Sequence, residues 1–244
     1  MDVIQLSTSV QDYLKVIWDL EEWDDGPVHP TDIAERTGMK QSTISGALSR
    51  MVNAGLVEHK PYGRVGLTSA GRRSAVTMVR RHRLLETFLV EVLGYSWDEV
   101  HEEADALEHA VSEKLVDRID RYLCYPAQDP HGDAIPTESG NMPVVPLTKP
   151  LAQVEDGRTV RVWRVSDQDP ALLRYLSQHR IRPGTLLKLV STGGASNGVQ
   201  VYIQNTSAGQ SNPDGDGGGD DSERIAEPLG LDDAQASKIQ VVIQ

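Results

Sequence analysis

Apolar residues in the first half of the chain recur every three to four positions, a spacing typical of amphipathic helices. Tyr13, Ile17 and Leu20 form one such stripe and predict a helix over 8–23, with Ser9 as its N-cap. The same pattern, interrupted by glycine or small polar residues, predicts five further helices. They are expected at 30–38, 41–54, 69–92, 97–110 (with Ser96 as its cap) and 112–124.

Between the third and fourth of these helices the pattern changes to alternation. Residues 56–60 and 65–68 read as two short strands joined by a turn at 61–64. Helix, short turn, helix and β-hairpin follow one another in the order of a winged helix-turn-helix. We therefore expect a winged-helix DNA-binding domain over 1–70 and a helical module that dimerises over 71–125.

The second half of the chain is predicted to be β-structured. Six prolines between 125 and 150 indicate an extended linker over 126–150. Beyond it we expect a small β-barrel over 151–244, with a low-complexity acidic insertion at 205–223 that is disordered. Its strands are expected at 159–165, 186–190, 199–204 and 239–243, with a short helix at 171–177. The fold class is thus mainly α in its N-terminal half, with a C-terminal small β-barrel.

Composition narrows the choice of partners. The net charge of −12 argues mildly against nucleic acid, but residues 36–83 carry ten Lys and Arg against one acidic residue. The excess of Asp and Glu over 7 Lys, with one Phe, is typical of a salt-adapted, haloarchaeal protein. An apolar run of membrane-spanning length and a signal segment are both missing, so a cytoplasmic protein is expected. Cys124 is the only cysteine, which excludes an intrachain disulfide and a thiolate cluster.

The second helix of the helix-turn-helix begins with small polar residues that can reach base edges and phosphates in the major groove. An interaction module with a merely solvated polar face is the alternative, and the basic clustering favours DNA. The candidate DNA-binding residues are Lys40, Gln41, Ser42, Thr43, Ser45, Arg50 and Arg64.

Histidines and carboxylates recur at helical spacing in the next module. His101, Asp105, Glu108 and His109 stand at i, i+4, i+7 and i+8, which places them on one helix face. Two imidazoles and two carboxylates resist burial on one face unless a cation lies among them. His82 and Glu86 repeat the i, i+4 spacing one helix earlier, whereas Glu102 and Glu103 read as a solvated face. A lone histidine is more often structural, so the joint spacing carries the metal interpretation.

These motifs resemble the diphtheria toxin repressor family of metal-dependent transcriptional regulators. The resemblance is strongest over residues 8–136, in Val-Arg-Arg-His82-Arg-Leu-Leu-Glu86, Val-His101-Glu-Glu-Ala-Asp105-Ala-Leu-Glu108-His109 and Asp129-Pro-His-Gly-Asp-Ala-Ile-Pro136. It implies a primary metal site from Asp12, Asp105, Glu108 and His109. It also implies an ancillary site from His82, Glu86 and His101, completed by Asp167 or Asp169 of the barrel.

Two departures from the family pattern bear on the metal. Iron-responsive members have Met at the position of Asp12 and Cys at that of Asp105, whereas this chain offers hard oxygen donors at both. Carboxylates with imidazoles suit Mn²⁺ better than softer ions, and Fe²⁺ remains the alternative. Lys15 stands where two-domain manganese members have a carboxylate ligand, so this chain should not build their second site.

The function expected from the resemblance is a homodimeric repressor, activated by Mn²⁺ (or Fe²⁺) at two sites per subunit. It would bind double-stranded palindromic operator DNA of metal-uptake genes, with no membrane partner, no small-molecule substrate and no enzymatic activity. The rival interpretations are a metalloenzyme that uses the same His, Asp and Glu cluster, and a metal-independent winged-helix regulator.

Overall fold

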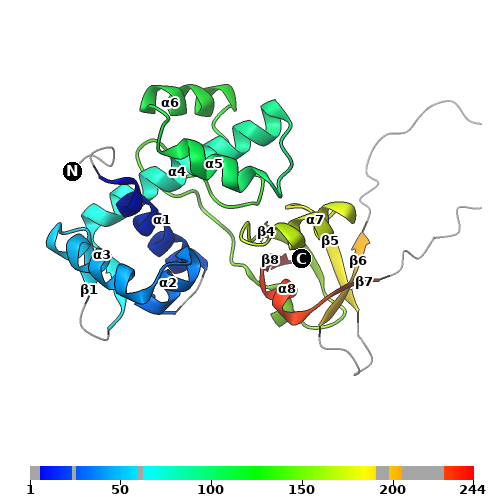
Figure 1. The fold of residues 1–244 in the computed structure, drawn as a ribbon. Helices are drawn as coiled ribbons and strands as arrows, with labels where there is room; N and C mark the ends of the chain where they lie inside the picture. Colours follow the sequence, from blue (N-terminus) through cyan, green and yellow to red (C-terminus); the bar gives the residue numbers. More distant parts are fainter. Residues whose placement is uncertain (1–5, 24–25, 60–62, 191–197, 205–227) are drawn as a thin grey trace, which may run out of the picture. The chain divides into compact units, whose positions relative to one another are not determined.

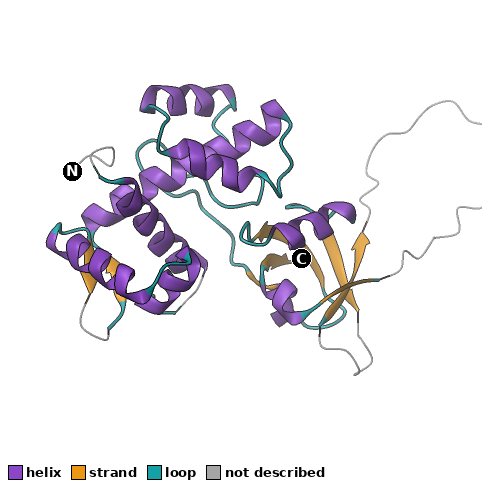
Figure 2. Cartoon of the chain, in the orientation of Figure 1, coloured by secondary structure: helices purple, strands orange, loops and turns teal. Residues whose placement is uncertain are grey.

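The chain folds into two compact units. A computed structural model describes residues 6–23, 26–59, 63–190, 198–204 and 228–244. Figures 1 and 2 show that one unit is mainly helical and that the other holds the larger sheet. The first unit contains residues 1–95, 100–129 and 134–143, and the second contains 96–99, 130–133 and 144–244.

The expected winged helix-turn-helix is confirmed in the first unit. The antiparallel wing pairs Val57 with Leu67 and His59 with Val65. Apolar residues of all three helices and both strands form one core, with Leu14, Ile17 and Ile44 at most 1% exposed. The elements are α1 (Thr8–Trp23), α2 (Pro30–Thr37), α3 (Gln41–Asn53), β1 (Val57–His59) and β2 (Val65–Leu67).

Two glycines fix the geometry of this domain. Gly38 ends α2 at φ +65°, a left-handed conformation that most side chains resist. Gly71 lies in the first turn of the next helix, where an added Cβ would be 1.9 Å from the carbonyl oxygen of Leu56. The missing side chain at Gly71 therefore lets that helix begin directly against the start of the wing.

The rest of the first unit is a helical domain built on α4 (Ser69–Leu93), α5 (Val100–Glu108) and α6 (Glu113–Tyr122). The first half of α4 contributes Val76 to the winged-helix core, and its second half contributes Leu85 to a separate core with α5 and α6. The side chain of Ser112 caps α6 by accepting a hydrogen bond from the Leu115 amide. One long helix thus belongs to both domains.

The start of α5 differs from the expectation. The helix begins at Val100 rather than near residue 97, so Ser96 lies outside it. The Ser96 amide donates to the Glu99 side chain at 2.9 Å within the turn that precedes the helix. Trp97, only 2% exposed, packs instead in the core of the second unit. Burial of this indole outweighs the local helical pattern of 97–99.

The second unit is the expected small β-domain, a six-stranded antiparallel sheet in the order β3-β8-β4-β5-β6-β7. Leu173, Leu187 and Val241 are fully buried in its core. The predicted insertion at 205–223 lies outside the described residues. The elements are β3 (Lys149–Pro150), a 3₁₀ turn (Leu151–Gln153), β4 (Thr159–Val165), α7 (Pro170–Gln178), β5 (Leu186–Val190), β6 (Val199–Gln204), β7 (Leu229–Leu231), α8 (Asp233–Ser237) and β8 (Ile239–Ile243).

Residues 126–150, assigned to an extended linker from their prolines, contain turns, and their structure is uneven. An antiparallel bridge pairs Gln128 with Ala134, and the Thr137 amide donates to the Asn141 carbonyl at 2.9 Å. Asp129 and Ile135 are buried in the first unit, and Asp133 is buried in the second. Val144 and Leu147, in contrast, are almost fully exposed. Among the helices that the structure describes, α4 included, none combines the length and apolar character needed to cross a bilayer.

Candidate metal centre

Three helices of the first unit bring the candidate ligands together. α1 packs on α4, and α4 packs on α5, so the faces that carry the polar residues converge. The seven ligands expected in this region fall into three overlapping groups. They come from α1 (Asp12), α4 (His82, Glu86) and α5 with the turn that follows it (His101, Asp105, Glu108, His109).

The first group lies between α4 and α5. His82 Nε2 is 3.0 Å from Glu86 Oε1 and 3.1 Å from His101 Nδ1, and His101 Nδ1 is 3.3 Å from the same carboxylate oxygen. Glu86 is 1% exposed and His82 is 5% exposed. Two imidazole nitrogens and one carboxylate oxygen therefore lie within 3.3 Å of one another.

The second group joins α1 to the end of α5. His109 Nε2 is 2.8 Å from Asp12 Oδ1 and 3.6 Å from Glu108 Oε1. The other ring nitrogen, Nδ1, is 2.7 Å from the Gln11 side-chain oxygen. The amide oxygen of Gln11 can only accept, so Nδ1 donates to it, and this hydrogen bond orients the ring with Nε2 toward Asp12 and Glu108.

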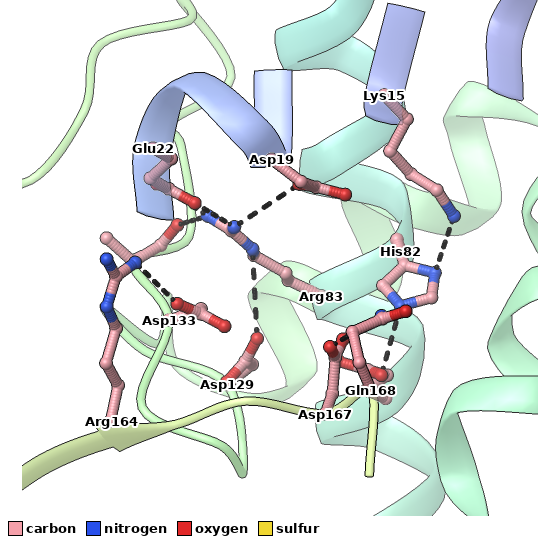
Figure 3. A network of polar contacts seen from close by, with 12 residues as sticks. Lys15, Asp19, Glu22, His82, Arg83, Asp129, Asp133, Arg164, Asp167 and Gln168 are labelled. Carbon is pink, nitrogen blue, oxygen red and sulfur yellow. Dashed lines mark hydrogen bonds and ion pairs between the residues drawn. The ribbon is translucent and has the colours of Figure 1, made fainter. Parts of the chain in front are cut away.

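The third group lies between the other two and contains Lys15. The Lys15 ammonium donates to Asp105 Oδ1 at 2.6 Å and to the two oxygens of Glu108 at 2.7 and 2.8 Å. It lies 3.3 Å from His82 Nδ1, a contact that Figure 3 shows reaching across from α1 to α4. The structure thus groups Asp105 with His82 and Glu108 around this ammonium, rather than with Asp12.

Charge and burial shift the ionisation of these groups. Burial alone would raise the pKa of Glu108, but the hydrogen bond from His82 and the nearby charges of His82 and Lys15 lower it. Burial and Lys15 lower the pKa of His82, but the charge of Glu86 and hydrogen bonds to Asp105 and Glu108 raise it well above the usual imidazole value. Despite burial, the two carboxylates raise the pKa of Lys15. The ionisation of each of these groups therefore depends on the charges of the others.

The donor set fits a hard or borderline divalent ion. Donor atoms 2.8–3.6 Å apart, as in the group around Asp12, Glu108 and His109, match the edges of a coordination shell. Bonds of about 2.0–2.6 Å to oxygen or nitrogen produce such edges. Carboxylate oxygens and imidazole nitrogens are the donors that Mn²⁺ and Fe²⁺ accept, and no sulfur atom belongs to the three groups of described residues.

Asp167 and Asp169, the candidate ligands of the β-domain, differ in what they already contact. Asp169 Oδ1 caps α7 by accepting from the Leu172 amide at 3.0 Å, and its Oδ2 pairs with Lys238 at 2.7 Å. Asp167 Oδ1 accepts a hydrogen bond only 2.8 Å long from the side chain of Gln168, its neighbour in sequence. Asp169 is therefore committed to local structure through both oxygens.

The candidate DNA-binding residues lie together on one domain and are open to solvent. All seven are exposed, from Lys40 at the start of α3 to Arg64 at the wing. The Ser45 hydroxyl bonds back to the Gln41 carbonyl at 2.9 Å. Glu102 and Glu103 are exposed as expected, so neither belongs to the metal centre.

Three residues at or near the centre escaped prediction from the sequence. Gln11 orients His109, Lys15 fills the middle group, and Arg81 donates to the Glu108 carbonyl at 3.4 Å and pairs with Glu113. Gln11 and Lys15 stand four residues apart on α1 and so share one face of that helix, and the departure of Lys15 from the family pattern was a further signal. Their roles depend on the packing of α1 against α4.

The fold and the centre define a class, a winged-helix protein with a candidate divalent-metal site in its helical domain. Models of the iron dependent repressor match residues 5–65 (N-terminal DNA binding domain) and 68–137 (metal binding and dimerisation domain). An FeoA domain model matches 149–209.

Whole-length relatives agree with these matches. The iron-dependent repressor IdeR of Mycobacterium tuberculosis is 32% identical over 209 residues, covering 84% of this chain and 87% of that protein. The diphtheria toxin repressor of Corynebacterium efficiens is 28% identical over 207 residues, covering 78% and 88%. The chain belongs to the iron-dependent repressor family of metal-dependent transcriptional repressors, as the motifs predicted.

Solved structures extend the comparison. A manganese-dependent transcriptional repressor in complex with manganese is 42% identical, with a TM-score of 0.83, and the match covers 96% of this chain and all of that one. The manganese regulator SloR is 30% identical with a TM-score of 0.73, covering 96% and 98%. Each of these relatives is named as a repressor or regulator rather than as an enzyme.

Proposed function

We propose that this protein is a divalent-metal-activated, dimeric transcriptional repressor of metal-uptake genes, and that its metal centre controls DNA binding through α1. The observation that carries the proposal is the double role of this helix. Asp12 belongs to the centre, while Leu14 and Ile17 on the same helix are buried in the winged-helix core. An ion bound between Asp12 and α5 would fix the orientation of the DNA-binding domain on the helical domain.

Manganese is the preferred ion, with Fe²⁺ as the alternative, and each subunit would hold two. One would bind at Asp12, Glu108 and His109, and the other at His82, Glu86 and His101. Asp105, which faces His82 and His101, would support either. Oxygen-rich donors favour Mn²⁺, and the solved relative bound to manganese supports the same choice.

A homodimer is supported by exposed apolar side chains at the end of α4 and on α6. Leu93 is 57% exposed, Leu115 46% and Tyr122 68%. Tyr122 also stacks edge-on with Phe88 of α4, with ring centroids 6.4 Å apart. Such residues are enriched in interfaces between subunits. Two-fold symmetry of the dimer would then match a palindromic operator, read by the start of α3 and the wing.

The decisive test is a titration of fluorescently labelled operator DNA with protein, with and without MnCl₂, FeCl₂, CoCl₂ or ZnCl₂. Mn²⁺ should raise the affinity for DNA at least tenfold, and Asp12→Ala should lose most of that gain. Asp12 is a suitable target because its side chain is 43% exposed, so its loss should not unfold the protein. Glu102→Ala, an exposed carboxylate on α5, is the matched control and should respond like the wild type. Equal DNA affinity with and without metal would reject the proposal.

A further inference from the structure

The three donor groups form a row in which neighbouring groups share a residue. Glu108 belongs both to the group of Asp12 and to the middle group, and His82 belongs both to the middle group and to the group of Glu86. A cation could therefore lie at three adjacent positions. The structure fills the middle one with a protein atom, the Nζ of Lys15.

We infer that the Lys15 ammonium is a permanent cation of the centre, which occupies the middle position and keeps a divalent ion out of it. The inference rests on the proposed function, because it concerns the number of ions that the same centre can hold. It goes further in assigning a role to a residue that is not a ligand.

The hydrogen bonds and burial of the Lys15 ammonium support a permanent place for it in the centre. The ammonium has hydrogen-bond acceptors at 2.6, 2.7 and 2.8 Å, which is the full set that three N–H groups of one amine require. The side chain is 10% exposed, and Glu108 beneath it is 1% exposed. The Lys15 ammonium is therefore buried and fully hydrogen-bonded, unlike the ammonium of a surface lysine.

Displacement of Lys15 by a metal ion would be costly. A divalent ion at the middle position needs the same oxygens of Asp105 and Glu108, so the ammonium would have to leave them. The packing of α1 on α4 holds the stem of Lys15 inside, so the displaced charge would be left buried without a carboxylate partner. The group of Glu86 does not use these oxygens. The group of Asp12 shares only Glu108 with the ammonium, and a carboxylate has enough lone pairs to accept from Lys15 and bind a metal ion at once, so metal should bind at both flanking positions.

The number of Mn²⁺ ions bound per subunit tests this assignment. Apoprotein prepared with a chelator is dialysed against MnCl₂, and bound Mn²⁺ is measured by elemental mass spectrometry alongside protein concentration. The wild type should bind two ions. Lys15→Glu replaces the cation by a ligand and should bind three, with electron paramagnetic resonance showing spin coupling between adjacent Mn²⁺ ions. Lys114→Glu, an exposed lysine of α6, makes the same charge change and should stay at two.

Lys15→Met provides a second variant that removes the charge and keeps the length of the side chain. It should also bind three ions, because the oxygens of Asp105 and Glu108 that accept from Lys15 become available to metal. Circular dichroism checks that each variant folds. Three ions in the wild type, or two in both folded Lys15 variants, would overturn the inference. A wild type that binds no Mn²⁺ would instead reject the proposed metal centre, together with the inference that rests on it.

Discussion

Arg83 and Glu22 form an ion pair that joins the middle of α4 to the last turn of α1 (Figure 3). The same guanidinium donates to the Ala134 carbonyl at 2.6 Å and lies 3.8 Å from Asp129. Arg83 directly follows His82, and neighbouring side chains on a helix point about 100° apart. One turn of α4 therefore contributes His82 to the candidate metal centre and Arg83 to a contact with the end of α1, the first helix of the DNA-binding domain.

Removal of this guanidinium should destabilise the protein. Arg83→Met keeps the apolar stem but leaves the partly buried Glu22 carboxylate without its ion pair to Arg83, which should lower the free energy of unfolding by about 3 kcal/mol. Urea denaturation measures the change. Arg73→Met, an exposed arginine of the same helix, should stay within about 0.5 kcal/mol of wild type. Similar losses of unfolding free energy for the two variants would show that the ion pair with Glu22 contributes no specific stabilisation.

Metal-free protein should lose stability as the pH falls. The pKa of Glu108 is lower in the folded protein than its unfolded value of about 4.3. Its stabilising contribution is therefore complete above that value and disappears as pH falls through the folded pKa. The pKa of Asp105 is lowered too: burial opposes this, but His82 and Lys15 outweigh it.

Urea denaturation of chelator-treated protein between pH 6 and pH 3 measures this dependence. Glu108→Gln cannot titrate, so its stability should change less over the same interval, from a lower starting value. A variant that follows the wild-type curve in parallel would contradict the assignment to Glu108.

Two glycine-to-alanine changes should have opposite signs. Gly71→Ala would place its Cβ 1.9 Å from the Leu56 carbonyl oxygen, and the necessary shift of α4 should cost about 1–3 kcal/mol. Gly46→Ala, inside α3, meets only the end of the Arg50 side chain at 3.7 Å and should stabilise by about 0.5–1 kcal/mol. Thermal unfolding followed by circular dichroism distinguishes them. Stabilisation by Gly71→Ala would mean that the wing does not approach α4 this closely.

Arg64 should contribute to DNA affinity without selecting sequence. Its charge stands at the exposed wing, where contact with a backbone phosphate is expected. Arg64→Ala should weaken binding to operator and unrelated DNA alike, and should reduce the slope of log affinity against log salt by about 1. Anisotropy titrations at several salt concentrations give both values. Lys114→Ala on α6 is the control, and an unchanged slope for Arg64→Ala would remove the wing from the interface.

Regular elements with a strong period were predictable from the sequence. α1, α3, α4 and strands β4, β5, β6 and β8 lie within one or two residues of their predicted bounds, because each buries a continuous apolar stripe or run. β3 and β7 were missed, since two or three residues carry no periodic signal. The start of α5 was misplaced because Trp97 is buried by residues distant in sequence.

The composition of the metal centre was predictable, but its inner arrangement was not. Spacing alone placed His101, Asp105 and Glu108 on one helix face. Lys15 was recognised as a departure from the family pattern, but its reach to Asp105, 90 residues away, depends on how α1 packs. The position of the ammonium at the end of a side chain with four rotatable bonds cannot be predicted from the sequence.

The donor atoms of the centre are oxygens of carboxylates and nitrogens of imidazoles, and the single thiol, Cys124, stands apart on the surface after α6. Peroxide attacks thiolates and thioethers, and neither is among these donors. Oxidative stress should therefore leave the first coordination shell chemically intact. A sensor with this shell can continue to report metal supply under conditions that would disable one with a sulfur ligand.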